Sequence, residues 1–195
     1  MFGLVLEKEI ASMLNAVKLI VICACALLVG CQAMPDTPQE QTTLRQQADA
    51  TLAKARRQNP NVETYVTSSI AYAVFPTVGK GGLIVAGGYG KGILYENGVM
   101  VGYCDATQLS VGALIGGQLC SELVFMQTAD ALEKFKSGDL ALEAEVSAIA
   151  MDQKATREAR YQNGVAVIFV DAMGLMAEAS AGGQKFRYVA ADLAE

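Results

Sequence analysis

The sequence predicts an α+β domain in which about three helices accompany a curved antiparallel sheet or partial barrel of about eight strands. Three observations lead to this prediction. Helical periodicity is confined to the first part of the domain and to one short later segment. Most of the remaining chain consists of short apolar runs that glycine interrupts. These runs do not alternate with long helices, as they would in a parallel α/β sheet.

The N-terminus has the pattern of a bacterial lipoprotein signal. Lys18 precedes an apolar run, Leu19–Val29, that is too short for a membrane-spanning helix, which needs about 20 residues. Small residues then lead into Cys31, so residues 1–30 are expected to be a signal peptide, with Met13 as an alternative start. The segment resembles a lipobox, which implies that Cys31 is acylated. A cleaved secretory signal or a membrane helix with a chance cysteine is the alternative.

The residues after Cys31 predict where the anchored protein lies. An Asp next to the acylated cysteine favours the inner membrane in lipoproteins of Gram-negative bacteria. This chain has Gln32 there, so the resemblance implies lipid anchoring at the periplasmic face of the outer membrane. Residues 31–43 are polar and contain Pro35 and Pro38, which predicts a flexible tether. Residues 44–195 are expected to form the domain.

Three helices are expected. The first ends at Asn59-Pro60, and its apolar face comprises Leu44, Ala48, Leu52 and Ala55. The second spans roughly Val62–Ala73 and is closed by Phe75-Pro76. The third is short, with Thr128 as its N-cap and Gly138 at its end. Its inward-facing residues are Ala131, Leu132 and Phe135.

Two dipeptides predict turns between strands. Asn97-Gly98 lies between two apolar runs, which is a strong signal for a hairpin joining residues 91–96 to 99–105. Gly182-Gly183 is expected to be a second hairpin turn, between "GLMAEASA" and "KFRYVAA". The polar segment 152–164 is expected to be an excursion on the surface.

Composition and motifs disfavour several activities. The chain has no histidine, so it can form neither a Ser-His-Asp triad nor a histidine metal site. A net charge of −5 argues against nucleic acid as a partner. The glycine-rich segment 78–94 fits neither the phosphate-loop nor the dinucleotide pattern, so its glycines are expected to allow close approach of strands. We therefore expect a protein without catalysis, cofactor or bound metal.

Two pairs of residues allow alternative interpretations. Glu143 and Glu145 alternate on an expected strand and share a face, where a solvated surface is favoured over a cation site or an acid–base pair. Cys104 and Cys120 can form a disulfide in an oxidising compartment. Two buried thiols are favoured, because cysteine is among the most buried residue types.

Four motifs of the chain are "FPTVGKGG", "GGYGKGIL", Ser-Val-Gly at 110–112 and "GLMAEAS". These are the most specific parts of a resemblance to the SYLF-domain family that extends over about residues 44–190. Eukaryotic members bind phosphoinositides or act on actin, and bacterial members are often predicted lipoproteins. The resemblance implies a lipid- or membrane-binding module without catalysis. The chain departs from the family pattern at Ala113-Leu114, so a different specificity is expected if these positions shape a binding surface.

The expected function is a lipid-anchored module that binds phospholipid or envelope membrane. The alternative is a structural envelope lipoprotein that contacts other proteins and uses lipid only as its anchor. Because the net charge is −5, any contact with anionic lipid must be local. The candidate lipid-binding cations are Lys54, Arg56 and Arg57 on the first helix, and Lys80 and Lys91 in the glycine-rich segment. The alternative interpretation is that these five side chains are solvent-exposed charges on a helix face and in turns, without a role in lipid binding.

Overall fold

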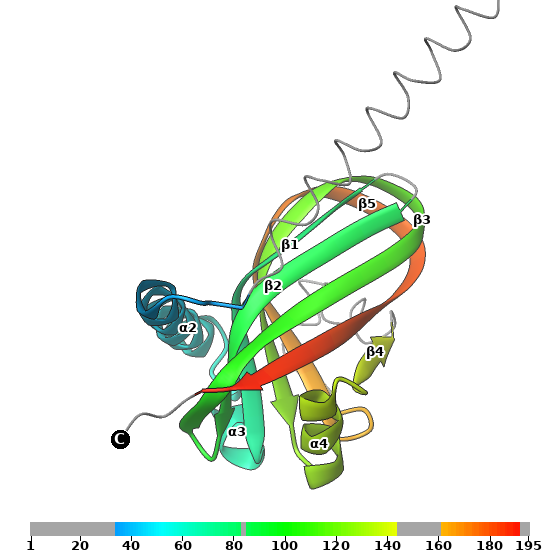
Figure 1. Ribbon diagram of the computed structural model, residues 1–195. Coiled ribbons are helices and arrows are strands. Elements are labelled where there is room, and N and C mark those ends of the chain that lie inside the picture. The colour runs from blue at the N-terminus through cyan, green and yellow to red at the C-terminus, as the bar shows by residue number, and fades with distance from the viewer. Residues whose placement is uncertain (1–33, 83–84, 144–160, 192–195) are drawn as a thin grey trace, which may run out of the picture. The chain divides into compact units, whose positions relative to one another are not determined.

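The computed structural model describes residues 34–82, 85–143 and 161–191. Its elements are α2 (Pro38–Gln58), α3 (Asn61–Ser68), β1 (Ala71–Gly82), β2 (Val85–Glu96), β3 (Val99–Met126), α4 (Ala129–Ser137), β4 (Ala141–Glu143) and β5 (Val165–Ala190). The predicted α+β fold with a curved antiparallel sheet is confirmed (Figure 1). The expected signal peptide, Cys31, Glu145 and most of the polar segment 152–164 lie outside the described residues.

The sheet curls because two long strands each take part in it twice. The first part of β3 pairs with β2, its last part pairs with β1, and β5 accompanies β3 along both. Across the sheet, the described strand segments follow one another in the order β5 (165–170), β3 (120–126), β1, β2, β3 (99–111), β5 (181–190) and β4. Figure 1 shows β3 and β5 sweeping together over one end of the curl. The expected strand count differs because several predicted strands are parts of these two.

Both faces of the sheet carry a hydrophobic core. On one face, here named the α2 face, side chains such as Tyr72, Val74 and Ile93 pack with α2 and α3. On the other, named the α4 face, Ala73 and Phe75 pack with Phe135 of α4 and with other strands. Successive residues of a strand point to opposite faces. The two-sided core therefore explains the nearly continuous apolar runs of this part of the sequence.

Helix α2 begins earlier than the apolar periodicity predicts. The side chain of Thr37 accepts the backbone N–H of Glu40 and caps the helix, whose first residue is Pro38. Proline is favoured there because its missing N–H is not needed in the first turn. Residues 38–43 are therefore helical, and their assignment to a flexible tether is wrong. The predicted apolar face of α2 is confirmed as buried.

The second predicted helix is too long. Helix α3 ends at Ser68, and Ala71–Ala73, expected to be helical, belong to β1. The residues that follow include Tyr72, Val74 and Phe75, and aromatic and β-branched residues favour strands. In this sheet both faces are covered, so all three side chains are buried. Phe75-Pro76 does not close a helix but lies inside β1. The register against β2 shifts between Val74 and Thr77, because proline cannot donate to the ladder.

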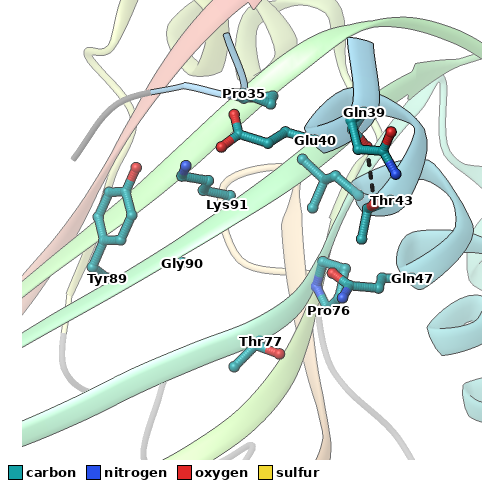
Figure 2. A pocket seen from close by; sticks show the side chains of 11 residues that line it. Pro35, Gln39, Glu40, Thr43, Gln47, Pro76, Thr77, Tyr89, Gly90 and Lys91 are labelled. Carbon is teal, nitrogen blue, oxygen red and sulfur yellow. Dashed lines mark hydrogen bonds between the residues drawn. The ribbon is translucent and has the colours of Figure 1, made fainter. Parts of the chain in front are cut away.

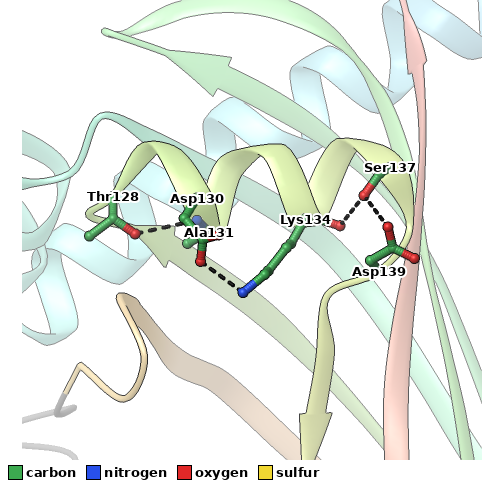
Figure 3. A network of polar contacts seen from close by, with 6 residues as sticks. All are labelled: Thr128, Asp130, Ala131, Lys134, Ser137 and Asp139. Atoms are coloured by element: carbon green, nitrogen blue, oxygen red, sulfur yellow. Dashed lines mark hydrogen bonds and ion pairs between the residues drawn. The ribbon is translucent and has the colours of Figure 1, made fainter.

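Helix α4 matches its prediction closely. The Thr128 side chain accepts the N–H of Ala131 at 3.3 Å (Figure 3). Gly138 ends the helix in the left-handed conformation at φ 83°. Asp130 and Lys134 form an ion pair of 2.8 Å on its exposed side. Ala131 and Phe135 are buried, and Leu132 packs partly buried against the same core.

The predicted turn at Gly182-Gly183 is wrong. Both residues lie within β5 and pair with Ser110 and Leu109 of β3. The two glycines provide no turn because the partner strand continues past them, so the ladder of hydrogen bonds is maintained on that side. The runs "GLMAEASA" and "KFRYVAA" are consequently parts of one 26-residue strand.

The Asn97-Gly98 hairpin is confirmed. Glu96 pairs with Val99, and Asn97 and Gly98 have φ of 49° and 79°, as a type I′ turn requires. Replacing Gly98 with valine is expected to destabilise the domain by about 1–3 kcal/mol, because a β-branched residue resists positive φ. Urea denaturation measures the loss. The matched control is Asn97→Gly, which suits the same turn, and equal stabilities of the two variants would contradict this account.

Candidate functional site

Helix α2 uses its apolar face to pack on the sheet. Leu44, Ala48, Leu52 and Ala55 are each at most 7% exposed and belong to the core on the α2 face. Arg45, at the edge of this face, donates to the hydroxyl of Tyr103 on β3 at 3.0 Å. Because the apolar face is already buried in the fold, a membrane can contact only the polar side of α2.

The predicted cations on α2 lie together near its C-terminal end. Lys54, Arg56 and Arg57 are all exposed. The Nε of Arg56 lies 2.6 Å from the carboxylate of Glu63 on α3. Since both groups of this pair are largely exposed, it contributes little to stability. The pair does, however, reduce the positive charge that this end of the helix presents.

The two predicted strand lysines lie on opposite faces of the sheet. Lys91 is on the α2 face, where it lines a cavity beside α2. Lys80 follows Val78 of the α4-face core by two positions, so it is on the α4 face. The structure therefore does not bring the five candidate cations into one patch.

The cavity has a volume of about 410 Å³ and lies between the first half of α2 and strands β1 and β2 (Figure 2). Its lining residues are Pro35, Gln39, Glu40, Thr43, Leu44, Gln47, Pro76, Thr77, Tyr89, Gly90 and Lys91. Figure 2 shows the carboxylate of Glu40 and the amino group of Lys91 pointing into the same space. One oxygen of Glu40 accepts the N–H of Asp36 at 3.0 Å. The Lys91 side chain makes no hydrogen bond or ion pair with any residue that the structure describes.

The chain enters the domain beside this cavity. Pro35 is buried and lines the cavity, and Met34 packs against the core on the α2 face. The side-chain amide of Gln41 also donates to the carbonyl of Pro35, at 3.4 Å. The domain is therefore packed from Met34 onward, only a few residues after Cys31.

An exposed strip of apolar side chains continues along the α2 face beyond the helix. This apolar strip comprises Val85, Leu109 and Leu119, which are 55%, 58% and 50% exposed. Gly79 of β1 pairs with both Tyr89 and Leu119, which places the strip one strand away from the cavity wall. Gly87 lies opposite Leu109, so β2 has no side chain at the position next to Leu109.

The α4 face contains a buried polar cluster, formed by Glu122, Gln184 and Gln108. Glu122 is 0% exposed. The side-chain amide of Gln184 donates to both oxygens of Glu122, at 2.9 and 3.0 Å, and accepts from the amide of Gln108 at 2.9 Å. Burial raises the pKa of Glu122 to about 7, and the hydrogen bond from Gln184 opposes this shift.

The favoured interpretation of the two cysteines is confirmed. Cys104 and Cys120 are free and buried, and both belong to the core on the α4 face. Burial raises the pKa of the Cys120 thiol to about 12 and that of Cys104 well above its ordinary value. Both side chains therefore act as small apolar groups.

Sequence reasoning missed the residues that acquire their role through distant pairing. Asp105 is buried and accepts from the Nε of Arg187 at 2.8 Å, and the two residues are cross-strand partners of β3 and β5. The Glu122–Gln184 contact joins the same two strands. No local motif signals either pair. The hydroxyl of Ser121, beside Glu122, donates to the carbonyl of Pro76 at 2.7 Å.

Comparison with known proteins adds no family to this picture. No family model matches the chain, and no curated protein matches it. Within the ranges that the structure describes, no helix is long and apolar enough to cross a membrane.

Proposed function

We propose that the protein is a lipid-anchored, non-catalytic SYLF-like module that binds phospholipid at the periplasmic face of the outer membrane. The apolar strip is the observation that carries the proposal. At least half of each side chain is exposed in Val85, Leu109 and Leu119, which lie on a part of the sheet that α2 leaves uncovered. Burial of apolar surface is favourable by about 25 cal/mol per Å², so the strip favours an apolar neighbour.

The short connection to the expected anchor supports the same orientation. Cys31 and Pro35 are separated by four residue steps, which span at most about 14 Å even when fully extended. An acylated Cys31 thus holds the entry point of the domain close to the bilayer surface. Pro35 and the apolar strip both lie on the α2 face. The anchor and the strip can therefore engage one membrane together.

A flotation assay on residues 34–195, which form a compact unit of their own, tests the proposal without the anchor. The wild-type domain is expected to float with phospholipid vesicles. The double variant Leu109→Asp/Leu119→Asp is expected to bind at least tenfold more weakly, since two apolar contacts are lost and two charges must stay hydrated.

The matched controls are Val99→Asp and Val189→Asp, which alter apolar side chains that are 64% and 48% exposed elsewhere. Both are expected to float like the wild type. In cells, Cys31→Ser is expected to abolish incorporation of labelled fatty acid. A wild-type domain that does not float with any vesicle would contradict the membrane-binding proposal. That result favours the alternative, a structural lipoprotein that contacts other proteins and uses lipid only as its anchor.

A further inference from the structure

The cavity beside α2 is lined by two residues of opposite charge, Glu40 and Lys91. Glu40 on α2 and Lys91 on β2 both line it, and Figure 2 shows their charged ends pointing into the shared space. No ion pair joins them in the part of the chain that the structure describes. Lys91 is only partly exposed, so its side chain loses some contact with water without gaining a hydrogen bond or ion pair from the described residues.

This arrangement discriminates among ligands by charge. A simple anion is attracted by Lys91 but repelled by the nearby carboxylate of Glu40, and a simple cation meets the reverse situation. A ligand that carries both charges satisfies both residues at once. We propose that the cavity binds the zwitterionic phosphoethanolamine headgroup of a membrane lipid, with its phosphate at Lys91 and its ammonium group at Glu40.

The lining favours a primary ammonium over a quaternary one. A primary ammonium has three N–H donors, and the lining residues include Glu40, Gln39 and Gln47, whose side chains carry oxygen acceptors. Quaternary ammonium groups are recognised by cages of several aromatic rings. Tyr89 is the one aromatic residue among the described lining residues, so these residues do not form such a cage. The volume of about 410 Å³ lies within the usual range for small-molecule sites.

The position of the cavity suits a ligand that stays in the membrane. Tyr89, on its wall, is next to the apolar strip through Gly79, and Pro35 is where the chain arrives from Cys31. A lipid headgroup can therefore occupy the cavity while its acyl chains remain in the bilayer. In this respect the inference rests on the proposed function, since the bilayer supplies the lipid.

Calorimetric titration of the full-length chain in a phosphate-free, nonionic detergent tests the site with soluble probes. The wild type is expected to bind sn-glycero-3-phosphoethanolamine at least fivefold more tightly than sn-glycero-3-phosphocholine or inorganic phosphate. Lys91→Met, which keeps most of the apolar stem, and Glu40→Gln, which keeps an acceptor for the Asp36 N–H, are each expected to weaken binding at least fivefold. Lys185→Met, at an exposed lysine of β5, is the control and is expected to leave binding within twofold.

Each contrary result overturns the assignment in a recognisable way. Equal binding of inorganic phosphate, together with tighter binding by Glu40→Gln, identifies a plain anion site. An unchanged affinity in Lys91→Met, or no heat from any probe, shows that the cavity is not a headgroup site. Because flotation depends on the apolar strip, intact flotation with failed titration overturns this inference alone. Failed flotation overturns the proposed function and leaves the titration as an independent result.

Discussion

Replacing Glu122 with glutamine is expected to stabilise the domain by up to about 3 kcal/mol at pH 8 and to remove the fall in stability that Glu122 causes between pH 4.5 and 7. Burial raises the pKa of Glu122 from 4.5 in the unfolded chain to about 7 in the folded one. The folded state therefore holds its proton more tightly, and stability falls as the pH rises through this window. A tenfold difference in proton affinity between the two states corresponds to about 1.4 kcal/mol.

The sign of this effect distinguishes Glu122 from an ordinary surface carboxylate. Below pH 4.5 Glu122 is protonated in both states and costs nothing, whereas above pH 7 the folded domain must hold a buried carboxylate. The nearby Cys120 does not titrate in this window, because burial raises its pKa to about 12. Urea denaturation from pH 4.5 to 8.5 measures the effect, with the exposed Glu133→Gln as the control. A wild-type stability that rises over this range would falsify the prediction.

The second large effect is expected at Gly92 of β2. A Cβ atom there would lie 2.6 Å from Cδ1 of Phe75 and 2.7 Å from the main-chain oxygen of Val74. Phe75 is completely buried and packs against Phe186, so neither neighbour can move away freely. Gly92→Ala is expected to lower the free energy of unfolding by about 2–3 kcal/mol, as overpacking of a core does.

Gly87, on the same strand, provides the matched control. A Cβ atom at Gly87 would have no neighbour within 4 Å, so Gly87→Ala is expected to be neutral or slightly stabilising through the unfolded chain. Thermal unfolding of the two variants side by side measures the difference. Equal melting temperatures would show that the close approach of β1 and β2 does not depend on glycine at position 92.

Local signals predicted the features that local chemistry determines. The Asn97-Gly98 turn and the Thr128 cap need only residues next to them in the chain, and both are present. Asn163-Gly164 is a second Asn-Gly turn, which the sequence analysis does not predict. Both residues have positive φ, and Gln162 and Val165 exchange two backbone hydrogen bonds across them. At Gly182-Gly183 the dipeptide misled, because pairing with a distant strand overrides the preference of glycine for turns.

The positions of the candidate site residues on the two faces of the sheet could not be predicted from the sequence of a single strand. Before Pro76, odd-numbered residues of β1 such as Ala73 and Phe75 face α4; after the register shift, Val78 does. The bulge therefore moves Lys80 to the α4 face and separates it from Lys91. A reading of uninterrupted alternation would place Lys80 beside Val74 on the α2 face. The cavity likewise forms only when α2 packs over β1 and β2.

Because β5 pairs with both parts of β3, the sheet stays incomplete until β5 has been made. Gly102 pairs with Ala190, and Met126 pairs with Val165, so every one of these contacts closes a long loop. Proteins dominated by such non-local pairing fold in milliseconds to seconds, more slowly than helical bundles. Until β5 arrives, β3 offers an unpaired edge along its whole length, to which other chains can add. The interval between synthesis of β3 and docking of β5 is therefore when the chain is most exposed to aggregation.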